Sequence, residues 1–455
     1  MGSCQKIKNI CASLFAVLLL APGSAAAYSG TVVDALTCKP IPGAFVTLGD
    51  AVARTGLDGR FQIGGEGAAL GLRAYGYGRS ELPVGDLKAG ETLSLVPFRP
   101  KALYLSSYGA GDMRLRESAL DLIRKTGLNA VVIDVKSDRG MIAYRTDIPL
   151  ATGIGAQKIV TIKHVRRLLD DLHKEGIYAI ARIVVFKDNV LALARPAWAV
   201  RTAGGVIWRD REGLAWTDPF ARQAWDYNID IAVEAARDGF DEIQFDYVRF
   251  PDAKGLVFSE PNTEENRIAA ISGFLAAARK RLVPYNVFLS ADIFGYVIWN
   301  RNDTGIGQRL KDLVQQVDYL SPMLYPSGFQ YGIPGYRDPI RHPRQVVYLS
   351  LRKAEDKTGL PAVRFRPWLQ AFRDYAFGGQ PFGGEEIAAQ IDAAQSIGTD
   401  GWMLWNPRNV YTAAGLPPRS GMVMKSHGGS PENLGGIGTE TCSGNIAEDA
   451  PRLGR

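Results

Sequence analysis

The pattern of apolar and polar residues changes near residue 99. Before that point, short apolar runs such as 31–33 and 44–48 are separated by turn-forming residues, among them Pro40, Pro42 and Asp58-Gly59. Turn signals about every ten residues between short strands are typical of a β-sandwich. We therefore expect residues 28–98 to form a small all-β sandwich domain. The change of pattern at Arg99-Pro100 also predicts that this domain can be removed without unfolding the rest.

From Lys101 onward, strand-like apolar runs alternate with stretches of helical periodicity. Leu115, Ala119, Leu122 and Ile123, for example, share one helix face. Eight strand–helix units predict an α/β fold, a (β/α)8 TIM barrel over residues 99–412. An open doubly wound sheet is the alternative, but 107–111 is a poor match to its glycine-rich phosphate turn. The strands are expected at 102–107, 130–135, 178–186, 242–249, 287–293, 317–325, 364–372 and 401–405.

The two ends of the chain differ from the rest. Residues 1–27 combine Lys6 and Lys8, a short apolar core and an Ala-rich cleavage site, as in a secretory signal peptide. We expect cleavage after Ala27 and a periplasmic or secreted protein. Residues 413–455 are rich in Gly, Ser, Pro and charge and are expected to be a disordered tail. Cys38 and Cys442 would remain after cleavage, and a disulfide between them is one alternative.

Composition excludes several classes of function. Hydrophobic residues make up 46% and charged residues 22% of the 455, as in an ordinary soluble protein. The net charge of +6 is scattered, so we expect no nucleic-acid partner. No stretch is long and apolar enough to predict a membrane span. The four histidines fall outside the expected strand ends, so we expect neither a metal site nor a cofactor.

The stretch from Gly239 to Pro251, GFDEIQFDYVRFP, is the most informative part of the chain. Side chains alternate along a strand, so Ile243 and Phe245 should face one side and Gln244 and Asp246 the other. Asp246, Tyr247 and Arg249 then stand at the carboxyl end of the strand, where barrels of this kind carry their sites. An ion pair between Asp246 and Arg249 that only fixes a loop is the alternative interpretation.

Other strand ends carry acidic, hydrogen-bonding and aromatic residues, which suit a sugar with many hydroxyls and apolar ring faces. Asp134 either pairs with Lys136 or contacts substrate, and Arg182 is a candidate ion-pair partner of Asp246. The expected partner is a polysaccharide. The candidate substrate-binding residues are Asp134, Lys136, Arg182, Tyr247, Arg249, Tyr325, Gln370, Trp405 and Asn406.

Two parts of the chain resemble known families. The stretches GTVVDALTCKPIPGAFVTL, RTGLDGRFQI and LRAYGYG resemble the carboxypeptidase regulatory-like β-sandwich. The stretches VVIDVKSDRG, EIQFDYVRFP, LSPMLYPSGF and GWMLWNP resemble a domain-of-unknown-function family named for putative glycosyl hydrolases, over residues 101–410. This resemblance implies a TIM barrel with glycosidase activity. GFDEIQFDYV is also similar to the chitinase family, but Val248 stands where that family has its catalytic glutamate.

Glycosidases usually need two carboxyl groups. Asp246 and Asp292 end neighbouring expected strands, about 4.8 Å apart, so we expect Asp246 as nucleophile and Asp292 as acid in a retaining reaction. Pairing of Asp246 with Asp134, two strands away, would predict inversion. A non-catalytic polysaccharide-binding barrel and an envelope or matrix scaffold are the alternatives, because no glutamate stands at these strand ends.

Overall fold

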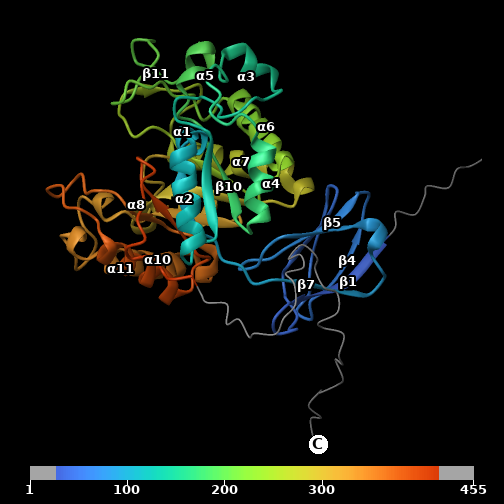
Figure 1. Ribbon diagram of the computed structural model, residues 1–455. Coiled ribbons are helices and arrows are strands. Elements are labelled where there is room, and N and C mark those ends of the chain that lie inside the picture. The colour runs from blue at the N-terminus through green and yellow to red at the C-terminus, as the bar shows by residue number, and fades with distance from the viewer. Residues whose placement is uncertain (1–26, 420–455) are drawn as a thin grey trace, which may run out of the picture.

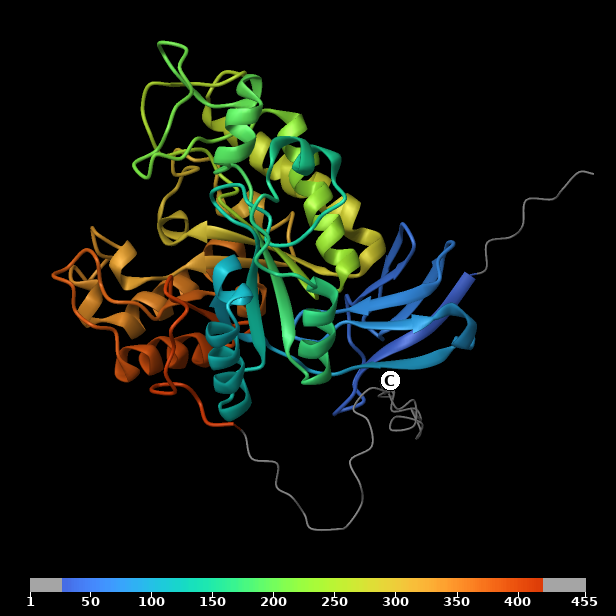
Figure 2. The same cartoon turned by 45° about the horizontal axis from the view of Figure 1, so that its top comes forward.

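The computed structural model describes residues 27–419. Within them the chain forms a β-sandwich followed by a barrel, and Figures 1 and 2 show the sandwich set to one side of the barrel. Some of the sequence predictions concern residues outside this range. They are residues 1–26 of the predicted signal peptide, Cys442, and residues 420–455 of the predicted tail. None of the described helices has the length and apolar character needed to cross a membrane.

The sandwich consists of two small sheets. One has the order β4-β1-β7 and the other the order β3-β2-β5-β6. Val32, Val46, Leu70 and Leu72 are among the side chains buried between them. Apolar side chains at alternate positions, cut by tight turns, favour this arrangement. The strands are β1 (Ala27–Asp34), β2 (Phe45–Leu48), β3 (Ala51–Arg54), β4 (Arg60–Gly64), β5 (Ala69–Arg73), β6 (Ser80–Pro83) and β7 (Glu91–Leu95).

The barrel is closed by eight parallel strands, as the sequence predicted. Around the barrel the order follows the chain, and the last strand pairs with the first. The strands are β8 (Lys101–Leu105), β9 (Ala130–Lys136), β10 (Tyr178–Val184), β12 (Glu242–Asp246), β14 (Phe288–Phe294), β15 (Tyr319–Met323), β16 (Trp368–Gln370) and β17 (Trp402–Trp405). The main helices are α2 (Met113–Lys125), α4 (Val165–Lys174), α6 (Arg222–Asp238), α7 (Glu264–Leu282), α10 (Pro343–Thr358) and α11 (Gly384–Ile397).

Shorter elements decorate the loops of the barrel. A two-stranded antiparallel ribbon pairs β11 (Arg201–Thr202) with β13 (Leu256–Val257) and links the loops that follow β10 and β12. Figure 1 shows β11 and α5 (Asn189–Ala194) far from the sandwich. The remaining short helices are α1 (Ser107–Gly111), α3 (Pro149–Ile154), α8 (Gly295–Trp299) and α9 (Leu310–Leu313).

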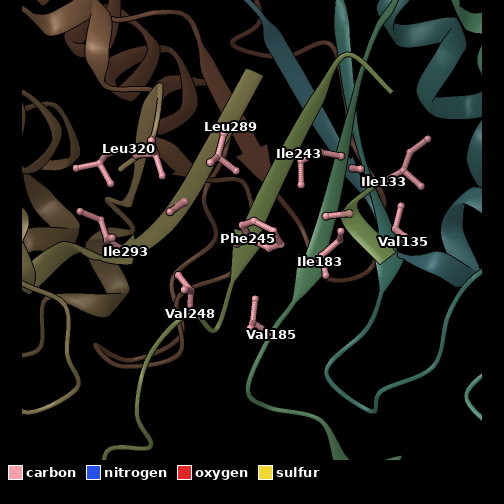
Figure 3. Packing of buried hydrophobic residues seen from close by; sticks show 14 of the residues in the cluster. Ile133, Val135, Ile183, Val185, Ile243, Phe245, Val248, Leu289, Ile293 and Leu320 are labelled. Atoms are coloured by element: carbon pink, nitrogen blue, oxygen red, sulfur yellow. The ribbon is translucent and has the colours of Figure 1, made fainter. Parts of the chain in front are cut away.

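Alternating side chains of the strands build two separate interiors. One set faces the helices, and Figure 3 shows Ile243, Phe245, Ile183 and Leu289 in this layer. Phe245 meets Phe274 of α7 with ring centroids 4.9 Å apart. The other set faces into the barrel. The predicted opposition of Ile243 and Phe245 to Gln244 and Asp246 is therefore confirmed, and it directs Asp246 toward the barrel axis.

The sandwich covers the amino-terminal end of the barrel. Tyr75, in the connection between β5 and β6, packs its ring against Phe45 of the sandwich and Tyr319 of the barrel, with centroids 5.7 and 5.9 Å away. Arg79 donates to Asp241 at 3.1 Å, and Arg73 donates to Asn286 at 3.2 Å. These buried and half-buried contacts cross the expected boundary. Whether the barrel stays folded without the sandwich remains a prediction, but its removal would break these contacts.

Several predicted boundaries differ from those in the structure, among them the end of the fourth barrel strand and the end of the barrel. The fourth barrel strand ends at Asp246 rather than at 249, because Tyr247 takes a left-handed backbone conformation with φ of 48°. A left-handed residue cannot continue a strand. The barrel also extends past 412: the amide of Gly127 donates to the carbonyl of Pro417 at 2.8 Å. Residues 413–419 therefore lie against the barrel instead of belonging to a disordered tail.

Candidate active site

A cavity of about 170 Å³ opens at the carboxyl ends of the barrel strands. A larger depression of about 730 Å³ lies elsewhere, between α2 and α4 on the outside of the barrel. Only the smaller one is formed by side chains of the strand ends, where barrels place their chemistry. Its lining consists of Arg182, Asp246, Tyr247, Arg249, Asp292, Phe294, Met323, Tyr325, Trp368 and Trp405.

Asp246 is held at the end of β12 by two partners. Arg182 on the neighbouring strand β10 donates to its Oδ2 through Nε at 3.0 Å and also through Nη2. The backbone N–H of Tyr247 donates to its Oδ1 at 2.5 Å. The left-handed turn at Tyr247 brings that N–H back toward the carboxylate. Asp246 therefore accepts three hydrogen bonds that fix its position at the end of the strand.

Arg182 lies between two carboxylates. It donates to Asp246 on one side and, through Nη1 at 2.5 Å, to Oδ1 of Asp134 on the other. Burial opposes the charge of the guanidinium, but Asp134 and Asp246 together raise the pKa of Arg182 well above its ordinary value. The Tyr104 hydroxyl donates to Asp134 Oδ2 at 2.6 Å and completes the set. The predicted pairing of Arg182 with Asp246 is confirmed.

Asp292, at the end of β14, has a different environment. Its side chain is fully buried, and the indole N–H of Trp368 donates to Oδ1 at 2.8 Å. Oδ2 has no hydrogen-bond partner among the described residues and lies 3.9 Å from Arg182 Nε. Burial, and then the charge of Asp246, raise the pKa of Asp292 well above its ordinary value. Asp292 therefore holds its proton more strongly than an ordinary carboxyl group does, next to a carboxylate that is bonded to Arg182.

The two carboxyl groups are close together. Oδ2 of Asp246 and Oδ2 of Asp292 lie 3.0 and 3.9 Å from the same nitrogen, Arg182 Nε. The separation of these two oxygens is therefore at most about 7 Å, which includes the spacing of about 5–5.5 Å found in retaining glycosidases. A carboxyl group that holds its proton strongly, at such a distance from a carboxylate bonded to an arginine, can supply an acid beside a nucleophile.

Aromatic side chains form one wall of the cavity. Trp405 stacks on Tyr104 with ring centroids 3.9 Å apart and meets Trp368 edge to face at 5.4 Å. The guanidinium of Arg182 lies 4.9 Å from the Trp405 ring. Tyr325 completes this side, and burial, followed by the nearby Asp292 and Asp246, raises the pKa of its hydroxyl. Such rings offer the apolar faces against which sugar rings pack.

Arg249 lies in the loop that follows β12, two residues after Tyr247. Its guanidinium is surrounded by the rings of Phe294, Trp216 and Tyr247, with centroids 4.6, 4.8 and 5.1 Å away. It forms no ion pair with Asp246, so the alternative of a loop-fixing Asp246–Arg249 pair is wrong. Lys187 lies near the same Tyr247 ring at 5.1 Å, but it is surrounded by carboxylates, including Glu212 at 3.0 Å.

Four of the predicted substrate contacts do not line the cavity. Lys136 is fully buried beside Asp188, with 2.6 Å between Nζ and Oδ2, because a bulge where β9 meets β10 shifts its register. It does not pair with Asp134, which instead forms an ion pair with Arg182. Gln370 is saturated by Ser327 and Phe372. The Asn406 amide donates to the carbonyls of Ala371 and Val410, so it organises a loop.

Sequence reasoning missed Tyr104 and Phe294 at the site. Tyr104 is the second inward position of β8 after Ala102, so alternation along the first barrel strand could have identified it. Phe294 was missed because the fifth strand was expected to end at residue 293, whereas β14 ends at Phe294. Among residues 27–419, no group of three or more His, Cys, Asp and Glu side chains is arranged to hold a metal ion.

Comparison with known proteins assigns the chain to a family. Similar solved structures include a hypothetical protein from Ruminiclostridium thermocellum ATCC 27405, with 41% identity over 42% of this chain and 96% of that one and a TM-score of 0.38. The glycoside hydrolase domain of PgaB (BpsB) from Bordetella bronchiseptica is 15% identical over 71% of this chain and 100% of that one, with a TM-score of 0.48.

A class V chitinase from Pseudomonas fluorescens Pf-5 is 14% identical over 70% of this chain and 96% of that one, with a TM-score of 0.42. None of the curated protein sequences matches the chain. The family model described as "Putative glycosyl hydrolase domain" matches residues 102–411, which is more than half of the chain. The chain therefore belongs to the putative glycosyl hydrolase domain family.

Proposed function

We propose that this protein is an exported, retaining glycoside hydrolase that acts on a polysaccharide of the cell envelope or extracellular matrix. The observation that carries the proposal is the contrast between two neighbouring carboxyl groups. Asp246 accepts hydrogen bonds from Arg182 and from the Tyr247 amide. Asp292 is buried with Oδ2 unbonded. Burial raises the pKa of Asp292, and a carboxyl group of raised pKa next to a carboxylate bonded to an arginine can act as the acid beside a nucleophile.

In this mechanism Asp292 donates its proton to the glycosidic oxygen as the bond to the anomeric carbon breaks. Asp246 attacks the same carbon and forms a covalent glycosyl ester. Asp292, now ionised, then takes a proton from water, and the hydroxide oxygen displaces Asp246. Arg182 holds Asp246 in position through two N–H groups. Trp405 and Trp368 supply the apolar wall for the sugar ring.

A non-catalytic polysaccharide-binding barrel is the second candidate function. It is favoured by the fact that both oxygens of Asp246 already accept hydrogen bonds from the protein. In that case the aromatic wall would bind a sugar chain, and no bond would be broken.

Turnover separates the two candidates. We would incubate the mature chain with extracellular polysaccharides and peptidoglycan and measure new reducing ends and product masses, with Asp246→Asn and Asp292→Asn as matched controls. The proposal requires hydrolysis by the wild type, its loss in both variants, and first-formed products that keep the anomeric configuration by NMR. Inverted products would exclude the double displacement. Binding without turnover of any member of the panel would favour the second candidate.

A further inference from the structure

Arg249 is a buried cation without an anionic partner. The residue is 9% exposed, and Nη1 donates to the carbonyl of Phe250 at 2.9 Å. Among residues 27–419, no carboxylate oxygen lies within 4.0 Å of its guanidinium, and Nε and Nη2 have no hydrogen-bond partner. Burial lowers the pKa of Arg249, but a guanidinium keeps its proton in proteins.

Arg364, which is equally buried, has no carboxylate partner but donates to the carbonyls of Asp318, Val314 and Val317. Three further buried cations of the barrel are neutralised by carboxylates. Arg182 bonds Asp134 and Asp246, and Lys136 bonds Asp188. Arg366 bonds Glu242 at 2.6 Å and also Asp400. Burying an unpaired charge is costly, and the aromatic rings around Arg249 offset only part of that cost. Arg249 is therefore a positive charge in the lining of the cavity that no carboxylate of the described residues pairs with.

Arg249 belongs to the lining of the cavity that also contains Asp246 and Asp292. A guanidinium with two free N–H groups matches the two oxygens of a planar carboxylate. A doubly charged phosphate fits less well, because the negative charge of Asp246 acts on the same place as the positive charge of Arg249. The nearby Lys187 cannot compensate, because it is already surrounded by acidic side chains.

We propose that Arg249 binds a carboxylate carried by a sugar of the substrate, so that the polysaccharide recognised by this site is an acidic one. The inference rests on the proposed function for its location, since it assigns Arg249 to the binding subsite next to Asp246 and Asp292. The carboxylate belongs either to a uronic acid or to a pyruvyl ketal on a neutral sugar.

The test compares polymers that differ only in the carboxyl group. Oligosaccharides of polygalacturonate, alginate and hyaluronan represent uronic acids, and those of a pyruvylated galactan, which contains no uronic acid, represent the pyruvyl ketal. Each is offered with its carboxyl-reduced form to the full mature chain carrying Asp292→Asn, and binding is measured by calorimetry. Carrageenan oligosaccharides, which carry sulfate alone, test a general preference for anions.

We expect at least one acidic oligosaccharide to bind at least tenfold more tightly than its reduced form. Adding Arg249→Gln should remove this difference and leave the affinity for the reduced form unchanged. Arg249→Lys keeps the positive charge but loses the paired N–H groups of the guanidinium, so it should retain part of the difference in affinity. This variant replaces Arg249→Gln if the glutamine variant does not fold. Equal binding of acidic and reduced forms, no binding of any acidic oligosaccharide, or equal preference for carrageenan would overturn the proposal.

Hydrolysis by the wild type over the same panel separates this inference from the proposed function. Arg249-dependent binding of an acidic polymer without cleavage would support the inference and contradict the hydrolase. Cleavage of a neutral polymer without any preference for its acidic counterparts would support the hydrolase and contradict the inference.

Discussion

Asp246 and Asp134 each form an ion pair with Arg182, through different nitrogens of its guanidinium, but only Asp246 lines the cavity. Each accepts hydrogen bonds from Arg182 and from one further donor, the Tyr247 amide or the Tyr104 hydroxyl. The two carboxylates therefore make similar contributions to the fold, while their access to a substrate differs. This symmetry provides a matched pair of variants.

We predict that Asp246→Asn lowers hydrolysis by several orders of magnitude, because an amide cannot form the glycosyl ester. Arg182 would keep Asp134 as its partner, so the loss of stability should be only about 1–3 kcal/mol. Asp134→Asn should cost a similar free energy of unfolding and leave much more of the activity. Melting curves and initial rates on both variants check this, and equal losses of activity would make Asp246 a structural residue.

Asp292→Asn should raise the melting temperature at neutral pH. Burial and the charge of Asp246 raise the pKa of Asp292 in the folded protein, while the unfolded value is about 3.9. The stability that the protonated group contributes is complete below the unfolded pKa and is lost as pH rises through the folded pKa. Asparagine does not titrate and still accepts from Trp368.

Melts of wild type and Asp292→Asn at a series of pH values test this prediction. The variant's advantage should be smallest at acid pH and should grow toward neutral pH. An advantage that shrinks as the pH rises would mean that Asp292 is ionised in the folded protein and cannot serve as the acid.

At the scale of single elements, alternation along a strand was enough to predict that Ile243 and Phe245 lie on the opposite side of β12 from Gln244 and Asp246. The end of that strand was not predictable, because nothing in the sequence DYVRF marks Tyr247 as left-handed. β16 is also shorter than expected. Pro367 precedes it and has no N–H for the ladder, and Arg364 ends a short 3-10 turn and donates to the carbonyl of Asp318 at 2.7 Å.

The pattern of strands likewise predicted some of the cavity residues and not others. Asp246, Asp292 and Arg182 were found because strand ends are where barrels carry chemistry. Lys136 was misplaced because the bulge between β9 and β10 changes its direction. Gln370 and Asn406 stand near the correct strand ends, but loop backbone groups take up their hydrogen bonds. Such local pairings follow from loop geometry, which periodicity does not describe.

The connection between β5 and β6, residues 74–79, packs against the amino-terminal end of the barrel, and we call it the plug. Tyr75 inserts between Phe45 and Tyr319, and the guanidinium of Arg364 lies 4.4 Å from its ring. We predict that Tyr75→Ala lowers the free energy of unfolding by about 2–3 kcal/mol through the cavity it leaves. Activity below the melting transition should not change, because the plug and the active-site cavity lie at opposite ends of the barrel.

Chemical denaturation of Tyr75→Ala measures this loss directly. Leu57→Ala is the control, since Leu57 lies in a turn of the same sandwich and is 93% exposed. A Tyr75 variant as stable as the Leu57 variant would show that the plug contributes nothing to stability.

For the whole molecule, the sequence predicted the two architectures but not how they join. The joining contacts pair residues far apart in the chain: Arg79 and Asp241 are separated by 162 positions, and Arg73 and Asn286 by 213. A single sequence contains no signal for such pairs. The family comparison likewise covers residues 102–411, so the likeness of the sandwich to carboxypeptidase regulatory-like domains stays a prediction.

We predict export with cleavage after Ala27. The mature chain would then begin at Tyr28, which leaves 28–34 of β1 to pair with β4 and β7. N-terminal sequencing of periplasmic or secreted protein should start at Tyr28. Recovery of the chain with residues 1–27 still attached, in a membrane fraction, would contradict this prediction.

The joining contacts also predict what removal of the sandwich would do. A fragment starting at Lys101 would lose Tyr75 from the end of the barrel and expose Tyr319. It would also lose the ion pair of Arg79 with Asp241. Asp241 would keep only His173 and the Ala179 amide as partners. We therefore expect the fragment to melt below the full mature chain, because newly exposed apolar surface and a stripped carboxylate both lower the stability.

Adding purified residues 28–98 to this fragment separates the loss of the interface from damage caused by truncation. Because the contacts are made by side chains and not by the linker, the separate sandwich should bind the fragment and raise its melting temperature toward that of the intact chain. Sandwich carrying Tyr75→Ala should raise it less. A fragment that melts at the same temperature as the full chain would show that the sandwich contributes nothing to the stability of the barrel. A lower but cooperative melt would still agree with the prediction, from the change of pattern at Arg99-Pro100, that the barrel stays folded without the sandwich.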